Sequence, residues 1–340
     1  MNTPKKVDNY SILIVAKYLQ QPEDYINLIC VCKNYKKTLK KFRYNPIPVH
    51  NTNLFPLMQT QFIYNPTEKR IEDVDLYRIC YPVSYKEYLE YQKEGNVKCS
   101  KVYYSKEDVE NHFDGTFPEV VHSLGYRAFQ GKTIQSLTIP SFITSLENNS
   151  LVSMTNLTLL ELSPMINQIP FGMLQICYSL ENIVIPPSVT SIGAYAFYAC
   201  TSLKDIVIPD SVSFIGKNTF ENCYQLSSVK LSSSLKTIEE QTFKNCLSLI
   251  SIDIPDNVSV TSSNAFESCT SLKQIKMSLN IQGISLEVFK DCQSLSELYI
   301  PSTCTYMGSN NFVMCTSQSC YFQCMYMLME YKVLITFYNP

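Results

Sequence analysis

The sequence predicts an α+β protein in which a solenoid of short parallel strands, repeating every 23 residues, follows a small helical segment. Two series of residues carry this prediction. Phenylalanines recur at a step of 23, at Phe197, Phe220, Phe243, Phe266, Phe289 and Phe312. Cysteines keep the same step, at Cys177, Cys200, Cys223, Cys246, Cys269, Cys292 and Cys315. A period this regular is typical of arrays whose units pack only against their neighbours.

The array begins before its clearest copies. Residues 117–129, "FPEVVHSLGYRAF", match residues 185–197, "IPPSVTSIGAYAF", position for position. A degenerate unit follows, with Leu157, Leu160 and Leu162 in the apolar positions. We therefore expect about eight to nine coils between residue 117 and about residue 318.

Each repeat contains one strand that alternates between apolar and polar residues. Alternation places Ile206 and Ile208 inside and Val207 outside, and Pro209 ends the strand because proline has no N–H to donate. Ser232 and Ser278 stand in the proline position of other repeats. Equivalent side chains of successive coils should stack about 4.7–4.9 Å apart.

A second apolar pair in each repeat supplies the opposite wall of the coil. In one repeat this pair is Val189 and Ile192, and in the next it is Val212 and Ile215. Phe197 and its copies are expected to fill the space between the two walls.

The cysteine series predicts a buried row of thiols. Metal sites use close pairs such as C-x-x-C, whereas these cysteines lie 23 residues apart. The first 24 residues contain an apolar stretch too short for a secretory signal, so we expect a reducing compartment and mostly free thiols. No metal and no cofactor are expected.

The unit "CTSLKDIVIPDSVSFIGKNTFENC" resembles the BspA-type leucine-rich repeat, which combines Leu-x-x-Ile-x-Ile-Pro with a Ser-Val-Thr-x-Ile-Gly stretch, Ala-Phe and Cys. The resemblance covers residues 117 to about 318, and the N-terminal segments are similar to the protist branch of that family. It departs where Glu239, Ser262 and Ser285 replace the glycine seen at Gly193 and Gly216. The resemblance implies a leucine-rich-repeat solenoid that recognises proteins, in a family with members discussed as surface or adhesion proteins, and it does not imply catalysis.

The outward residues of the repeated strand form a candidate partner-binding face. Its members are polar or of mixed charge, and the alternative is that they are only solvated. They are Glu181, Asn182, Val184, Lys204, Asp205, Val207, Ser228, Lys230, Ser251, Asp253, Gln274, Lys276, Glu297 and Tyr299.

Residues 1–50 predict two short helices, of which the second runs towards Asn45-Pro46. They resemble an F-box loosely, with "PED" followed by "LICVCKNY", but lack its Leu-Pro entry. The resemblance implies a substrate receptor of a ubiquitin ligase. The alternative is a helical cap over the first coil, because solenoids require capped ends.

A basic cluster follows in the same segment: Lys33, Lys36, Lys37, Lys40, Lys41 and Arg43. Helical spacing would place several of these side chains on one face, where they could contact an anionic membrane surface or an acidic protein. The alternative is an ordinary solvated helix face.

The remaining segments contain no recognisable catalytic or ligand-binding motif. Residues 51–116 form a linker or N-terminal subdomain with a helix expected in "SYKEYLEYQKE", and residues 319–340 form an apolar C-terminal cap or tail in which Glu330 and Lys332 disfavour a membrane span. The three histidines lack metal-site neighbours, and no phosphate loop or nucleophile motif occurs. Catalytic residues and nucleic-acid binding are therefore not expected.

The prediction for function is a non-enzymatic protein-interaction scaffold whose partner is unspecified. An F-box-like receptor and a cell-surface or adhesion protein are the alternatives. We expect a cytoplasmic protein, with a membrane-peripheral or surface position by an unconventional route as the alternative.

Overall fold

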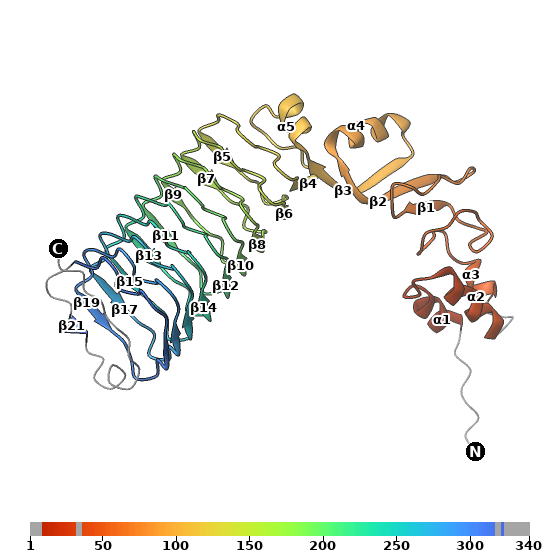
Figure 1. The fold of residues 1–340 in the computed structure, drawn as a ribbon. Helices are drawn as coiled ribbons and strands as arrows, with labels where there is room; N and C mark the ends of the chain where they lie inside the picture. Colours follow the sequence, from red (N-terminus) through yellow and green to blue (C-terminus); the bar gives the residue numbers. More distant parts are fainter. Residues whose placement is uncertain (1–8, 32–35, 317–320, 323–340) are drawn as a thin grey trace, which may run out of the picture. The chain divides into compact units, whose positions relative to one another are not determined.

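The computed structural model describes residues 9–31, 36–316 and 321–322 (Figure 1). The chain divides into two compact units, residues 1–103 and 104–340. Each unit has its own hydrophobic core. The predicted tail, residues 319–340, lies almost wholly outside the described residues.

The first unit combines short helices with a small parallel sheet. Strands β1, β2 and β3 pair side by side in that order. The elements are α1 (Asn9–Ala16), α2 (Pro22–Val31), α3 (Lys36–Leu39), β1 (Thr60–Ile63), β2 (Leu76–Ser84), α4 (Tyr85–Glu94) and β3 (Val97–Tyr104).

Helix α4 confirms the helix expected in "SYKEYLEYQKE". Ser84 caps its N-terminus in a capping box with Glu87, and Gly95 ends it in the left-handed conformation. The sequence therefore fixes both ends of this helix through local hydrogen bonds.

The N-terminal helices pack around Tyr25, which is fully buried. Its hydroxyl donates to the carbonyl oxygen of Ala16 and ties the end of α1 to α2. Burial raises the pKa of Tyr25 to about 12, so the hydroxyl keeps its proton at neutral pH. The core around it contains Ala16, Tyr25, Leu39, Phe42, Ile47, Val49, Phe55, Met58 and Val74.

The prediction of a second helix reaching Asn45-Pro46 was wrong at its C-terminal end. The helical segment α3 ends at Leu39, and Tyr44 forms a β-bridge with Thr60 instead. Phe42 is nevertheless buried beside Phe55, with ring centroids 5.5 Å apart. Tertiary packing of the aromatic rings thus overrides the helical spacing of the apolar residues.

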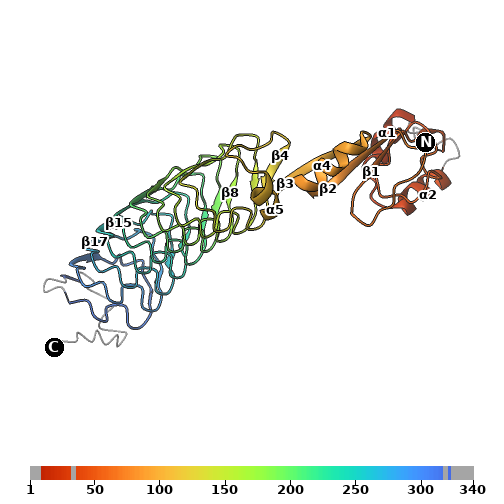
Figure 2. The ribbon, with the colours of Figure 1, turned by 90° about the horizontal axis from the view of Figure 1, so that it is seen from above.

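The second unit is the predicted solenoid (Figures 1 and 2). It begins with α5 (Lys106–His112), and its strands form two rows. The first row is β5 (Ser136–Thr138), β7 (Leu159–Glu161), β9 (Asn182–Ile183), β11 (Asp205–Val207), β13 (Ser228–Lys230), β15 (Ser251–Asp253), β17 (Gln274–Lys276), β19 (Glu297–Tyr299) and β21 (Tyr321–Phe322). The second row is β4 (Val121–Leu124), β6 (Ser145–Leu146), β8 (Gln168–Ile169), β10 (Ser191–Ile192), β12 (Phe214–Ile215), β14 (Thr237–Ile238), β16 (Val260–Thr261), β18 (Gly283–Ile284) and β20 (Tyr306–Met307).

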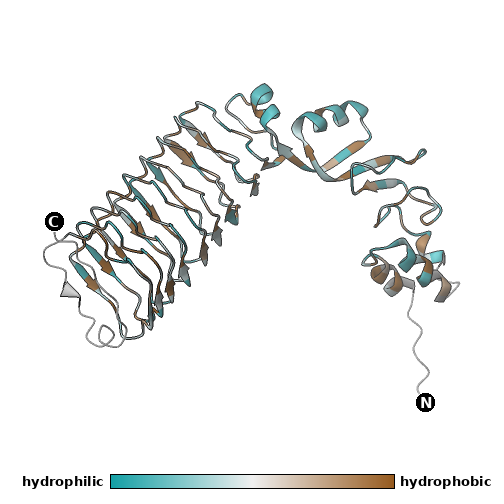
Figure 3. Cartoon of the chain, in the orientation of Figure 1, coloured by the Kyte–Doolittle hydropathy of each residue, from teal (hydrophilic) through white to brown (hydrophobic). Residues whose placement is uncertain are grey.

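The inward and outward assignments are confirmed. Ile206 and Ile208 are each 2% exposed, whereas Val207 between them is 56% exposed. Val189 and Ile192 are fully buried on the opposite wall. Apolar and polar residues accordingly alternate along the coils (Figure 3).

The phenylalanine series forms a continuous stack inside the coils. Neighbouring rings lie within 7–11° of parallel, with centroids 5.3–6.0 Å apart. These distances exceed the 4.7–4.9 Å that we expected, because stacked rings prefer an offset that moves their centroids beyond the strand spacing.

The cysteine series is buried and free, as predicted, from Cys177 to Cys292, and Cys315 is partly exposed. Each thiol donates to a carbonyl oxygen of the preceding coil; Cys223, for example, donates to Phe197 at 3.2 Å. Burial raises the pKa of Cys177 and Cys269 to about 12.

We expect alkylation at pH 8 to separate these thiols from an exposed one. The thiolate is the reactive form, so Cys30, which is exposed, should react first, while Cys200, Cys223 and Cys246 should stay unmodified until the protein is unfolded in urea. Mass spectrometry of the individual peptides measures both rates. Equal reaction of Cys30 and Cys223 in the native protein would contradict burial.

An aromatic cluster covers the first coil. Phe113 and Phe117 pack against Phe129 with centroids 4.9 and 5.8 Å away, and Tyr104 contacts both Phe113 and Phe117. These rings therefore cover part of the first coil's apolar edge, and a capping role for residues 1–50 stays a prediction.

The strand rows are interrupted at several steps, since β6 and β8, β9 and β11, β12 and β14, and β13 and β15 are not paired. Two consecutive interruptions, at β12/β14 and β13/β15, form what we call the seam. On the phenylalanine side the coils stay joined there: Phe220 N–H donates to Thr242 at 2.9 Å, and the Phe220 and Phe243 rings stack.

Candidate functional site

The predicted partner-binding face lies along the first strand row. All of its residues, from Glu181 to Tyr299, are exposed. Lys204 Nζ lies 2.6 Å from Glu181 Oε2, but both side chains are about half exposed, so solvent screens this pair. The arrangement agrees with the predicted outward orientation, and binding by this face stays a prediction.

A groove opens in the middle of this face, at the seam. It encloses about 630 Å3 between β13 and β15. Five of the predicted residues line it: Ser228, Lys230, Ser251, Asp253 and Lys276. Val229, whose equivalents Ile206 and Ile252 are buried, is partly exposed here.

Among the described residues, two main-chain N–H groups at this groove lack a hydrogen-bond acceptor. In neighbouring coils Ile208 N–H donates to Lys230 and Ile254 N–H donates to Lys276, both at 2.8 Å. The equivalent N–H of Leu231 has no acceptor in the described part of the chain, which is also true of Ile185 and Met277 in other coils. The same holds for Ile250 N–H, although its equivalent Lys273 donates to Ile250 at 2.8 Å.

The second strand row suggests the cause. A Cβ on Gly216 would lie 2.4 Å from Ala194 N, so the coils of this region approach to a distance that only glycine allows. Glu239 occupies the next equivalent position and carries a side chain. Among the described residues, the N–H groups of Lys236 and Glu239 lack the inter-coil bonds that their equivalents Ser213 and Gly216 make.

We expect hydrogen exchange to detect the seam. The amides of Leu231 and Ile250 should exchange faster than those of Ile208 and Lys273, because only the latter pair donates to a neighbouring coil. Site-resolved exchange on the intact protein provides its own control. Equal protection at the four amides would show that the seam is closed in solution.

An apolar shelf beside the groove was missed in the sequence. Tyr224, Leu247 and Ile250 are 42%, 38% and 51% exposed, and Ile250 also lines the groove. Two signals could have revealed it. Aromatic or aliphatic residues directly follow Cys223 and Cys246, and Ile250 stands where other repeats have Lys204 or Lys273.

The basic cluster is only partly placed. Lys37, Lys40, Lys41 and Arg43 are exposed, but Lys33 lies outside the described residues, as does the side chain of Lys36. The predicted helical face comprises Lys33, Lys36, Lys37 and Lys40, and α3 ends at Leu39, before the last of these residues. Contact with an anionic surface stays a prediction.

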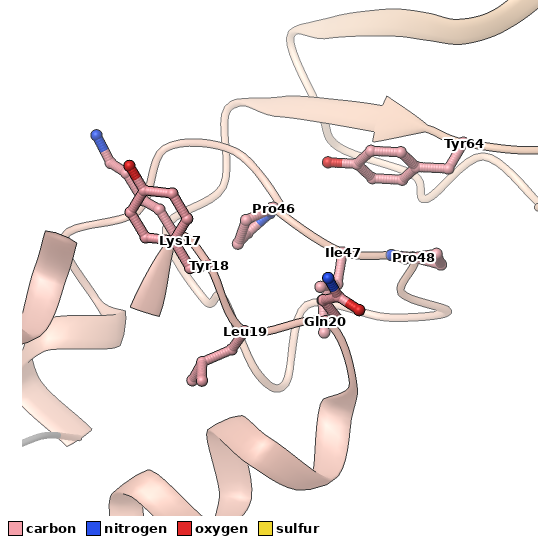
Figure 4. Close-up of a pocket in the computed structure, with 8 residues that line it drawn as sticks. All are labelled: Lys17, Tyr18, Leu19, Gln20, Pro46, Ile47, Pro48 and Tyr64. Atoms are coloured by element: carbon pink, nitrogen blue, oxygen red, sulfur yellow. The ribbon is translucent and has the colours of Figure 1, made fainter. Parts of the chain in front are cut away.

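The first unit has a shallow pocket of about 420 Å3 where α1 ends (Figure 4). Tyr18 and Tyr64 lie on its opposite sides, with Pro46, Ile47 and Pro48 between them. Lys17 is an exposed cation at its rim.

Metal and membrane sites do not emerge from the described residues. In this part of the chain no three His, Cys, Asp or Glu side chains come close enough to hold an ion. His50, His112 and His122 are exposed. Among the helices that the structure describes, none is long and apolar enough to cross a bilayer.

Comparisons with known proteins agree with this geometry. The BspA type Leucine rich repeat region matches residues 107–204 and 190–319, in six copies. No curated protein matches. A leucine-rich repeat protein from Bacteroides ovatus has a similar structure, with a TM-score of 0.54 and 27% identity over 56% of this chain.

The match covers 49% of the Bacteroides protein, so the chain spans about half of that relative. A leucine-rich repeat protein from T. pallidum is 30% identical over 48% of this chain and 75% of its own, with a TM-score of 0.44. The family match covers well over half of the sequence and coincides with the solenoid coils. The chain therefore belongs to the BspA-type leucine-rich repeat family.

Proposed function

We propose that the protein is a non-enzymatic scaffold that binds a partner protein through the first strand row. The supporting observation is the groove at the seam, which opens within a row of exposed residues. Its mixed lining of lysines, aspartates and serines beside an apolar shelf suits a protein surface. The buried stack beneath holds these side chains in register, so they could vary without disturbing the core.

Charge reversal tests this proposal. Lys230 and Lys276 line the groove, are exposed and take part in no ion pair within the described residues. The double variant Lys230→Glu/Lys276→Glu should reduce binding of a partner captured by the wild-type protein at least tenfold, because close charge complementarity is reversed. Quantitative pulldown against the purified partner measures the loss.

The matched control reverses a lysine on another part of the solenoid. Lys217 is exposed but belongs neither to the strand row nor to the groove, so Lys217→Glu should leave binding unchanged. If both variants bind as well as wild type, the partner site lies elsewhere.

A second candidate function rests on the N-terminal helices, which would dock an adaptor in the manner of an F-box. The observation that favours it is an uncovered apolar set on α1, α2 and the turn between them. Ile14, Val15, Tyr18 and Ile26 are 43%, 49%, 79% and 51% exposed within the described residues. Exposed apolar side chains that cluster are typical of interaction sites.

Adaptor docking is tested by pulldown of a ligase adaptor subunit with the full-length protein and with the double variant Val15→Asp/Ile26→Asp. Loss of adaptor in the variant alone would support docking through these helices. Absence of the adaptor from the wild-type sample would remove the F-box interpretation.

A further inference from the structure

The seam divides the solenoid into two blocks that remain attached along one side. The first block ends with β13 and the second begins with β14, so the turn at residues 231–236 crosses between them. On the phenylalanine side, Asn218, Phe220 and Asn222 donate their N–H groups to the following coil at 2.9 Å each. On the two strand sides the pairing is missing.

This distribution of bonds is that of a hinge. Separating β13 from β15 would break no strand pairing, whereas separating β15 from β17 would break the pairing of Ser251, Ile252 and Asp253 with the next coil. One side-chain bond crosses the seam at the turn, from Asn257 Nδ2 to Ser233 O at 2.7 Å, and one main-chain bond crosses it before β15, from Ser248 N–H to Tyr224 O at 3.1 Å. β9 and β11 are unpaired too, but the seam is the step at which both strand rows are interrupted in succession.

The unpaired edges of β13 and β15 are complementary to the main chain of an extended peptide. Leu231 and Ile250 line the groove, and their N–H groups have no acceptor among the described residues, so the groove is bordered by main chain that can pair with another strand. An inorganic anion would satisfy only the donors. An extended peptide supplies both donors and acceptors from one backbone, and adding a strand to an open sheet edge is an established mode of recognition.

The surroundings agree with a peptide carrying at least one apolar side chain. Tyr224, Leu247 and Ile250 form the shelf beside the groove, and Val229 is partly exposed within it. The lining carries both signs of charge, with Lys230 on β13, Asp253 on β15 and Lys276 on β17. The groove thus offers apolar contact and both signs of charge to one extended chain.

We propose that the seam is a docking slot for an extended segment of a partner protein, which pairs its main chain with β13 and β15. The slot widens by about one strand spacing, roughly 4.8 Å, as the blocks turn about the phenylalanine side. This proposal rests on the proposed function, since it assigns a kind of partner segment to the same face.

A peptide that copies the chain's own strand serves as the probe. Residues 249–255, "LISIDIP", form the strand on one side of the slot and have the alternation that the sheet accepts. A fluorescent synthetic peptide of this sequence should bind the full-length protein saturably, one to one, in an anisotropy titration. The bound peptide should slow hydrogen exchange at Leu231 and Ile250, while Ile208 and Lys273 stay unchanged.

The matched control is the same peptide N-methylated at alternate residues, which keeps every side chain and removes main-chain donors. It should bind at least tenfold more weakly, because strand addition depends on those donors. Equal binding of both peptides, binding without protection of Leu231 and Ile250, or no binding would each overturn the slot. The charge-reversal experiment would still test separately whether the first strand row binds the partner protein, since it measures the captured partner and not the peptide.

Discussion

Replacing Phe243 with alanine should destabilise the solenoid by about 3–5 kcal/mol, the range for a large aromatic deletion in a core. Phe243 is fully buried and stacks on Phe220 and Phe266, with both centroids 5.4 Å away. Its N–H also donates to Ala265 at 2.8 Å, a bond that alanine would keep. The loss is therefore one of packing rather than of hydrogen bonding.

The position of Phe243 adds a second consequence. It lies on the phenylalanine side of the seam, where the two blocks are still joined, so the variant should let one block unfold before the other. Two transitions in urea, followed by site-resolved hydrogen exchange, would reveal the uncoupling. Phe214→Ala is the control: Phe214 is 48% exposed on β12, and its loss should change the unfolding free energy by less than about 1 kcal/mol. A single transition for Phe243→Ala would argue that the seam does not divide the solenoid.

The coil interior was predictable because each of its positions repeats. Phe197, Cys200 and Ile206 have copies in neighbouring units, and all three are buried as their periodicity indicated. A second series, of asparagines, was not recognised in the sequence. Asn218, Asn264 and Asn310 lie 46 residues apart and share positive φ angles of 58–61° with the intervening Gln241 and Glu287 at 55°. Asparagine tolerates this conformation better than most residues, so its recurrence signalled a tight turn beside every second phenylalanine of the series.

The seam was not predictable from single positions. The departure from glycine at Glu239 was visible in the sequence, but Ser262 and Ser285 depart from it as well, and the strands beside them remain paired. Glu239 differs from these two serines because its N–H makes no inter-coil bond among the described residues, whereas Ser262 N–H donates to Ile238 at 2.8 Å and Ser285 N–H donates to Thr261 at 2.9 Å. The interruption is a relation between two adjacent coils, and the pattern of a single repeat does not contain it.

The close approach of the coils at Gly216 predicts the result of adding one methyl group there. In Gly216→Ala the new Cβ would meet backbone atoms of Ala194 and Gly193 at 2.4–2.9 Å, and backbone cannot move aside as a flexible side chain can. We expect a loss of about 1–3 kcal/mol, the usual cost of overpacking, and faster exchange of the Gly216 amide, which donates to Ile192 at 2.9 Å. Thermal unfolding and hydrogen exchange measure the two effects.

Gly283→Ala separates this steric effect from the general consequence of replacing glycine. A Cβ there would meet only the Tyr306 side chain, at 3.6 Å, which is ordinary contact. Removing a glycine from a strand also restricts the unfolded chain, so this variant should be unchanged or more stable by about 0.4–1 kcal/mol. The two substitutions are chemically identical and should act in opposite directions. If Gly216→Ala were as stable as Gly283→Ala, the coils that carry Gly193 and Gly216 would not be as closely packed in solution as the structure shows.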